Sequence, residues 1–256
     1  MRHAVAVSPH LDDAVFSCGA TLAGLAAGGW EITLVTVFTA APPGAADEAM
    51  GVRRAQDRAA AERLGVGEVV HLGLPEAPHR GYETVFTGVR DADDAPALAA
   101  AALGPVLDGR PPDRILAPLG LDGHVDHLVV GEALEWLSHP APVVRWRDTP
   151  YALREVPPGR LPGETGIPVA AQLERKLAAC AAYVAEVADH FGGEAAMRAA
   201  LTAFHEAEGR RLRVGGPAEV LVEPPLDPRR ERAKRRERER EERAALAKLR
   251  AQIARS

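Results

Sequence analysis

The chain of 256 residues carries 36 acidic and 31 basic side chains, a formal net charge of −5, and 46% of its residues are hydrophobic. A chain of this size can bury one sizeable core, and its length predicts one or two domains. Residues 229–256 are strongly basic, so the preceding part is more acidic than the total suggests. That charge balance disfavours a binder of nucleic acid.

Cysteine usage and hydropathy exclude further classes. Cys18 and Cys180 are far apart and form no paired motif, so we expect neither a structural zinc knot nor a disulfide framework. The first residues have too short an apolar stretch for a secretory signal, and Pro9 interrupts it. No run approaches the roughly 18 apolar residues of a membrane helix. We therefore expect a cytoplasmic protein without membrane contact.

Short apolar runs alternate with Ala- and Leu-rich stretches up to residue 222. The runs expected to form strands are residues 4–7, 32–38, 69–72, 115–118, 143–146 and 220–222. The stretches expected to form helices are residues 14–27, 52–64, 95–107, 128–138, 169–188 and about 194–208. This alternation predicts an α/β fold, a single Rossmann-like doubly wound, mostly parallel sheet with helices on both faces.

The pattern changes after a proline-rich break at residues 223–228. Beyond it, basic side chains alternate with Glu, and opposite charges recur at the i,i+3 and i,i+4 spacing of a solvated helix. We expect one domain over residues 1–228 and a charged helical tail over 229–256. The alternative for the tail is a basic contact surface for phosphates or for a partner protein.

The first candidate site follows the first predicted strand. His10, Asp12 and Asp13 crowd the junction between this strand and the next helix. Ligands of open α/β sheets bind at the carboxyl ends of strands. Adjacent carboxylates repel each other, and a divalent cation removes that conflict. Because histidine and aspartate are ordinary zinc ligands, this segment indicates a metal site.

A second polar cluster follows the predicted strand 115–118. His124, Asp126 and His127 come after a glycine-rich loop, again at a strand-to-helix junction. An HxxH pair alone is weak evidence, because histidine often caps or packs at helix starts. Two such clusters at equivalent junctions converge if the two strands are neighbours, and the pair favours a metal centre.

These two segments resemble the motif pair of the PIG-L/LmbE-like zinc deacetylases, PxHxDD after the first strand and a later GHxDH. The resemblance extends over roughly residues 1–222 and does not include the tail. It implies an enzyme, a Zn²⁺-dependent N-deacetylase acting on a linear amide, with a small-molecule N-acetylated amino sugar as substrate.

The resemblance also implies a division of labour among the motif residues. The zinc ligands would be His10, Asp13 and His127. Three ligands with one open position are what a catalytic zinc needs. Asp12 matches the general base. His124, as a cation, would stabilise the oxyanion or assist the leaving amine, with Asp126 orienting it.

The sequence departs from the family pattern at three positions. Ala14 stands where many members have Glu, and Leu11 replaces a common Pro, without changing a ligand. Asp122 lies in the loop where one branch of the family carries a Tyr near the reacting carbonyl. Oxyanion stabilisation then depends mostly on zinc and His124.

Polar side chains of the loops above the sheet are candidates for binding substrate. They are Arg54, Glu76, His79, Arg80, Asp122 and Asp148. Arg54 fits the family's pocket arginine better than Arg53, and the alternative is an exposed helix-start arginine. Asp148, Pro150 and Tyr151 resemble a segment of the family that would help to close the pocket. The remaining histidines are expected to pack or to lie at the surface, namely His3, His71, His139, His190 and His205.

The leading functional hypothesis is deacetylation of an N-acetylglucosamine-type glycoside, as in antibiotic or cell-envelope intermediates. The alternatives are hydrolysis of another amide, such as a thiol-sugar conjugate, and a noncatalytic metal- or sugar-binding module. Asp12 and His124 argue against the binding module, because a binder needs the ligands alone. No GxGxxG or GxxxxGK[ST] follows the first strand, which disfavours a phosphate-binding Rossmann protein. The oligomeric state is left open.

Overall fold

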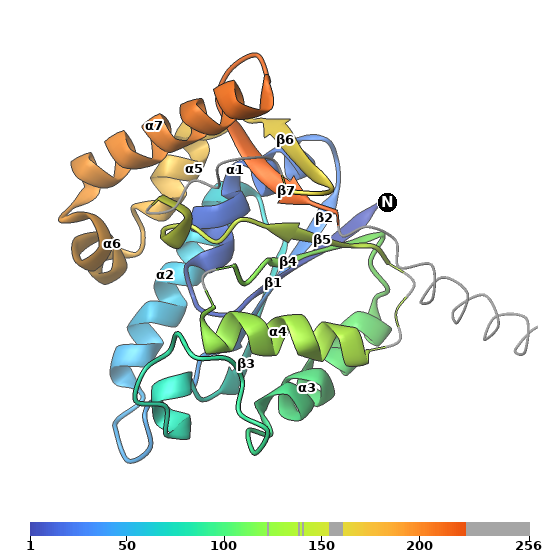
Figure 1. The fold of residues 1–256 in the computed structure, drawn as a ribbon, viewed down its shortest axis with the longest axis vertical. Coiled ribbons are helices and arrows are strands. Elements are labelled where there is room, and N and C mark those ends of the chain that lie inside the picture. The colour runs from blue at the N-terminus through green and yellow to red at the C-terminus, as the bar shows by residue number, and fades with distance from the viewer. Residues whose placement is uncertain (122, 138, 140, 154–160, 224–256) are drawn as a thin grey trace, which may run out of the picture. The chain divides into compact units, whose positions relative to one another are not determined.

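A computed structural model describes residues 1–121, 123–137, 139, 141–153 and 161–223 (Figure 1). The expected charged tail at 229–256, the domain boundary at 228 and the substrate candidate Asp122 lie outside the described residues. No helix in the described part is long and apolar enough to cross a membrane.

Within the described residues, seven strands form one sheet in the order β3-β2-β1-β4-β5-β7-β6. The strands are β1 (His3–Ser8), β2 (Glu31–Phe38), β3 (Glu68–Leu74), β4 (Arg114–Pro118), β5 (Val143–Trp146), β6 (Glu164–Pro168) and β7 (Ala218–Val222). Strands β3, β2, β1, β4 and β5 are parallel, and β7 runs antiparallel to both β5 and β6. The predicted mostly parallel α/β sheet is confirmed.

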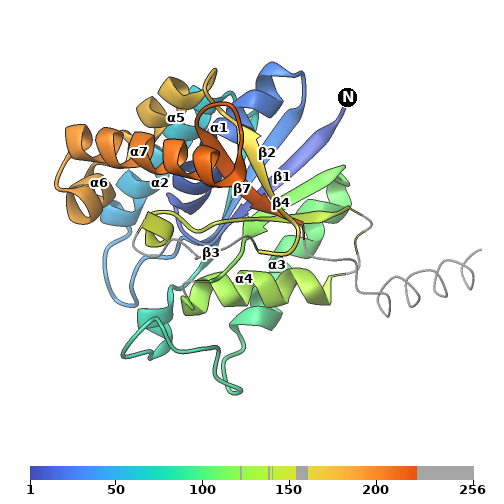
Figure 2. The same ribbon diagram turned by 45° about the horizontal axis from the view of Figure 1, so that its top comes forward.

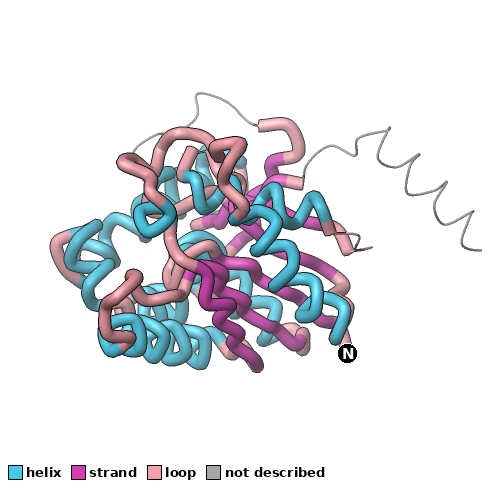
Figure 3. Tube along the Cα trace, turned by 90° about the horizontal axis from the view of Figure 1, so that it is seen from below, coloured by secondary structure: helices cyan, strands magenta, loops and turns pink. Residues whose placement is uncertain are grey.

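Helices cover both faces of the sheet, as the tube in Figure 3 shows. On one side lie α1 (Asp13–Ala27), α2 (Glu48–Leu64), α5 (Leu173–Cys180), α6 (Val184–Phe191) and α7 (Glu194–Leu212). On the other side lie α3 (Ala95–Gly109) and α4 (Val125–Trp136) (Figure 2). Two short 3-10 helices, η1 (Ala77–Arg80) and η2 (Tyr151–Leu153), belong to loops.

Strand β1 shows how the sequence makes two cores. Side chains alternate across a strand, so Ala4 and Ala6 pack with α1, α2 and α5, whereas Val5 and Val7 pack with α3 and α4. All four side chains are fully buried. A parallel strand covered on both faces therefore reads as a continuous apolar run.

The predicted helix over residues 169–188 is wrong, because the structure has two helices there, α5 and α6. The break falls at Tyr183, whose backbone is not helical (φ −86°, ψ 74°). Its hydroxyl donates to the buried carboxylate of Asp57, with 2.7 Å between the two oxygens. This contact is with a residue far away in the chain, so no local sequence pattern signals it.

The sheet order fixes where the candidate site forms. β1 pairs in parallel with β4, so the segments that follow these two strands leave the same edge of the sheet. The chain winds from β1 towards β2 and β3 on one side and from β4 towards β5 on the other. Ligands bind at such a switch point in doubly wound folds.

Candidate metal centre and active site

The two polar segments predicted from the sequence meet at this edge. One donor atom from each of His10, Asp13 and His127 lies within 4.8 Å of the other two. Asp13 Oδ2 is 3.0 Å from Nδ1 of His10 and 3.3 Å from Nε2 of His127. The three expected zinc ligands are thus brought together, with the carboxylate between the two imidazoles.

The electrostatics of this group fit a bound cation. Although burial opposes the charge, the carboxylates of Asp13 and Asp126 raise the pKa of His10 to about 10. Burial also opposes the charge of Asp13, but His127 and His10 hold the pKa of its carboxyl well below the usual range. The carboxylates thus favour positive charge at the centre. Two imidazole nitrogens and a carboxylate oxygen are a donor set that Zn²⁺ takes with an open position.

Asp148, expected to bind substrate, lies behind His127 instead. Its Oδ1 is 3.3 Å from Nδ1 of His127, and its Oδ2 accepts a hydrogen bond from the Gly120 backbone at 2.8 Å. Metal-binding histidines commonly use their second nitrogen in this way, which fixes the orientation of the ring.

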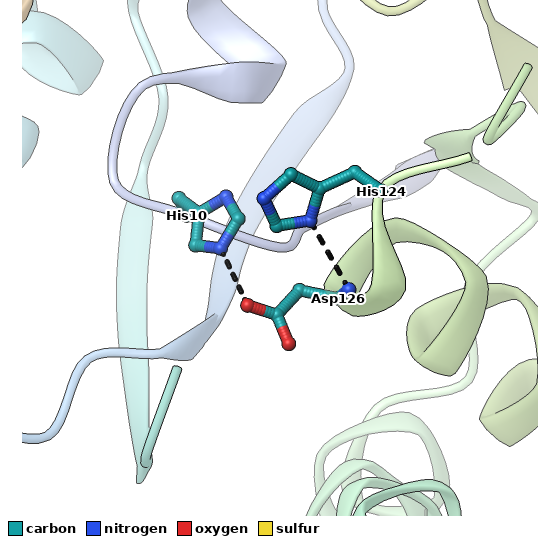
Figure 4. A group of neighbouring side chains, drawn as sticks. All are labelled: His10, His124 and Asp126. Carbon is teal, nitrogen blue, oxygen red and sulfur yellow. Dashed lines mark hydrogen bonds and ion pairs between the residues drawn. The ribbon is translucent and has the colours of Figure 1, made fainter. Parts of the chain in front are cut away.

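His124 begins helix α4 as its N-cap (Figure 4). Its Nδ1 accepts a hydrogen bond from the Asp126 backbone N–H at 3.2 Å, so the proton of the neutral ring is on Nε2. Burial and the neighbouring His10 and His127 lower its pKa to about 4. The lowered pKa favours the neutral ring, whereas the sequence predicts a cation.

The Asp126 carboxylate contacts His10, whereas the sequence predicts that it orients His124 (Figure 4). Its Oδ2 lies 2.9 Å from Nε2 of His10 and accepts from the Ala77 backbone at 3.0 Å. The Asp126 backbone, rather than its side chain, holds His124. Asp126 therefore supports the ring of a candidate metal ligand.

Arg80, another substrate candidate, is engaged in ion pairs. Its Nη1 donates to Asp126 Oδ1 at 2.8 Å, and its Nη2 lies 3.1 Å from Asp93 Oδ2. The guanidinium side chain is 8% exposed. It therefore neutralises Asp126 beneath the pocket.

A pocket opens over His10, Asp12, Asp13, His124 and Asp126. Its other lining residues are Arg53, Glu76, Pro78, Val85, Pro150, Tyr151, Glu186 and His190. Of the polar side chains expected to bind substrate, Glu76 is among them, and His79 is not.

Arg53 lines the pocket in place of its neighbour Arg54. Arg53 Nη1 donates to Glu76 at 3.1 Å, and its Nε donates to Glu186 at 2.7 Å. Arg54 donates to the Thr39 carbonyl and pairs with Asp47. The expectation placed on Arg54 thus moves to Arg53.

Sequence reasoning did not find the contribution of α6 to the pocket. Glu186 and His190 are four residues apart, so they share a helix face, and both line the pocket. This i,i+4 polar pair was the available signal. The sequence alone did not connect this pair with the two motifs, because the break at Tyr183 that separates α6 from α5 was not predicted.

Asp12 lines the pocket beside the candidate metal ligands and is 7% exposed. Burial and the neighbouring Asp13 carboxylate raise its pKa to about 8. A carboxyl whose pKa is raised in this direction exchanges a proton closer to neutral pH than an ordinary aspartate does.

The chain matches the PIG-L family, described as GlcNAc-PI de-N-acetylase, over residues 5–137. It belongs to this family. It is also 35% identical over 159 residues to the 2'-N-acetylparomamine deacetylase of Streptomyces fradiae. That match covers 57% of this chain and 56% of the relative, so the chain spans little more than half of the relative's length.

Solved structures of deacetylases share the fold over most of both chains. A deacetylase of the teicoplanin biosynthesis pathway is 26% identical, with a TM-score of 0.73 over 86% of this chain and 96% of its own. The zinc-inhibited form of a teicoplanin deacetylase is 25% identical, with a TM-score of 0.71 over 86% of this chain and 97% of its own.

Proposed function

We propose that this PIG-L family member is a zinc-dependent hydrolase that removes an acetyl group from an N-acetylated amino sugar. One observation carries the proposal. Asp13 lies between His10 and His127, and Asp12 and His124 line the pocket next to them. A noncatalytic metal-binding module would need the three ligands but neither of the other two side chains.

The geometry favours His10, Asp13 and His127 as the ligands over a second group formed by His10, His124 and Asp126. Both oxygens of Asp126 already accept hydrogen bonds, from Arg80 and from the Ala77 backbone. Its charge is therefore balanced by the protein.

When bound, zinc would polarise the acetyl carbonyl and lower the pKa of a water ligand towards about 7. Asp12 accepts the proton of the attacking water and later delivers it to the departing nitrogen. His124 donates its Nε2 hydrogen to the oxygen that gains negative charge, a contribution of about 3 kcal/mol for one such donor. Asp148 and Asp126 hold His127 and His10 in orientation.

The substrate class follows from the pocket lining and from the relatives. Arg53, Glu76 and Glu186 offer charged hydrogen-bonding groups, which suit the hydroxyl and amino groups of sugars better than a long acyl chain. The similar proteins named above are deacetylases in antibiotic pathways or of an acetylated paromamine. We therefore propose an N-acetylglucosamine-type unit attached to a larger group.

A mass-spectrometric screen tests this function directly. The zinc-loaded protein is incubated with N-acetylated amino sugars, glycosides that carry them and thiol-sugar conjugates, and each product is examined for loss of one acetyl group. His127→Ala protein serves as the control for contaminating activity. Loss of acetyl from an amino-sugar compound with wild-type protein alone is the expected result. Turnover confined to the thiol-sugar conjugates, or no turnover at all, would contradict the proposal.

A further inference from the structure

Helix α1, which begins at the metal centre, is broken near its middle. Cys18 has non-helical backbone angles (φ −129°, ψ 20°). The break separates a single turn, residues 13–17, from the longer segment 19–27. Asp12 and Asp13 stand at the start of that single turn. The segment 13–17 is little longer than one helical turn of about 3.6 residues, so its far end lies close to Asp13.

The carboxylate of Glu219, the second residue of β7, caps the segment after the break. Its Oε1 accepts from the Ala20 backbone at 2.9 Å, and its Oε2 accepts from the Thr21 backbone at 2.7 Å and the Thr21 hydroxyl at 2.6 Å. The first N–H groups of a helix lack partners within it. A buried carboxylate accepts their hydrogen bonds, and its negative charge interacts favourably with the helix dipole. Glu219 is 1% exposed.

Lys176 of α5 reaches both sides of the break. Its ammonium lies 2.7 Å from Glu219 Oε1 and donates to the Ser17 carbonyl at 3.5 Å. It also donates to Nε2 of His205 at 2.9 Å. A side chain at Gly19 would place its Cβ 3.3 Å from Lys176 Cγ, so the glycine leaves room for the lysine stem. Lys176 is fully buried.

Further hydrogen bonds connect both ends of this turn with segments beside the pocket. The Ser17 hydroxyl accepts from the Thr149 backbone at 3.0 Å, and Thr149 precedes the pocket residue Pro150. At the other end of the turn, the Ala14 backbone donates to the Ser8 hydroxyl at 3.0 Å. The turn that carries Asp13 is thus held at both ends.

Stability alone gives little reason for this arrangement. A buried ion pair commonly contributes no more to stability than apolar side chains of the same volume, because both charges lose their hydration. The charged groups instead fix how the two segments of α1 are oriented, since Glu219 and Lys176 bond backbone groups on opposite sides of the break.

We propose that Lys176 and Glu219 are positioning residues that set the turn 13–17 and so place Asp12 and Asp13 at the metal centre. The expected effect on metal binding rests on the proposed function. Its structural part, the position of the turn, can be measured without metal or substrate.

The test compares Glu219→Gln with Glu164→Gln as a matched control. Glu164, on β6, is also a buried glutamate. Each of its two carboxylate oxygens accepts a hydrogen bond from Arg211 at 2.7 Å. Two readouts are used, the backbone amide NMR signals of Asp12 and Asp13 in metal-free protein, and the affinity and visible absorption of bound Co²⁺, which reports ligand geometry in zinc sites.

We expect Glu219→Gln to shift both amide signals, to change the cobalt absorption and to weaken cobalt binding about tenfold, the lower end of outer-shell effects. Glu164→Gln should lose a similar amount of thermal stability without these changes. Unchanged amide signals and cobalt affinity in folded Glu219→Gln protein would overturn the proposal.

If Glu219→Gln does not fold, Thr21→Val decides by the same criteria, because it removes one donor to the carboxylate and keeps the charge pair. Wild-type protein that binds no cobalt would count against the proposed metal centre. The amide signals would then decide whether Glu219 positions the turn. Normal cobalt binding with no deacetylation would count against the proposed function alone.

Discussion

Asp148 Oδ1 lies 3.3 Å from Nδ1 of His127, while Nε2 of the same ring lies 3.3 Å from Asp13. The imidazole is thus held between two carboxylates, one in the candidate metal centre and one behind it. His10 is held similarly, with Nδ1 3.0 Å from Asp13 and Nε2 2.9 Å from Asp126. Each candidate histidine ligand has an acidic partner that fixes its ring.

Asp148→Asn should therefore weaken zinc binding about 10- to 100-fold and leave the fold intact. The carboxylate behind a metal-binding histidine orients its ring and makes it more basic, and the variant lacks that carboxylate. Competition with a chromophoric chelator measures the dissociation constant. A zinc affinity equal to that of wild type would mean that Asp148 does not support the ligand.

Arg53 and Arg54 make a matched pair, because they are adjacent on one helix and differ in whether they line the pocket. Arg53→Gln should lower kcat/KM about tenfold, since the pocket loses a charged group paired with Glu76 and Glu186. Arg54→Gln should stay near wild type, because the pair that Arg54 makes with the exposed Asp47 contributes about 1 kcal/mol or less. Steady-state kinetics on one substrate compares the two variants. A larger loss of kcat/KM in the Arg54 variant would indicate that Arg54, and not Arg53, contacts the substrate.

The buried cluster around Lys176 predicts sensitivity to acid. Burial and the Lys176 charge lower the pKa of His205 from 6.5 to about 3. Below pH 6.5 the unfolded chain binds a proton at this position and the folded protein does not. The free energy of unfolding should therefore fall by about 1.4 kcal/mol per pH unit from this group alone, down to about pH 3.

Glu219 acts in the same direction at lower pH. Although burial opposes its charge, Lys176 lowers the pKa of Glu219 below the usual 4.5, so its contribution is lost as the pH falls through that range. Urea unfolding of wild type and His205→Gln between about pH 7 and pH 5 separates the histidine from the carboxylates. The variant should show a flatter dependence, and parallel curves for the two proteins would contradict the assignment.

The repeated strand and helix patterns made much of the fold predictable. Runs such as Val5 to Val7 and Ile115 to Ala117 are apolar at every position, because parallel strands are buried on both faces. The same reasoning placed both polar motifs at strand ends, and the pairing of β1 with β4 in the structure brings those ends together. β6 was missed because Glu164–Pro168 lacks such a run and pairs with the antiparallel strand β7.

Which side chains face the pocket depends on contacts that no local pattern encodes. The choice between Arg53 and Arg54 is decided by Glu186, a residue more than a hundred positions away. Arg80 and Asp148 have the polar character of substrate-binding residues, but Asp126 and His127 engage them from a separate segment of chain. Such pairings become visible only in three dimensions.

In the proposed mechanism, Asp12 serves as the base beside a metal held by its neighbour Asp13. The most direct measurement is acetate release by zinc-loaded wild-type, Asp12→Asn and Asp13→Ala proteins, with zinc content determined for each. Asp12→Asn should retain zinc and lose about 10²- to 10⁴-fold in rate, whereas Asp13→Ala should lose both zinc and turnover. Near-normal acetate release by Asp12→Asn would contradict the role of Asp12 as the base, and full zinc content in Asp13→Ala would contradict the role of Asp13 as a ligand.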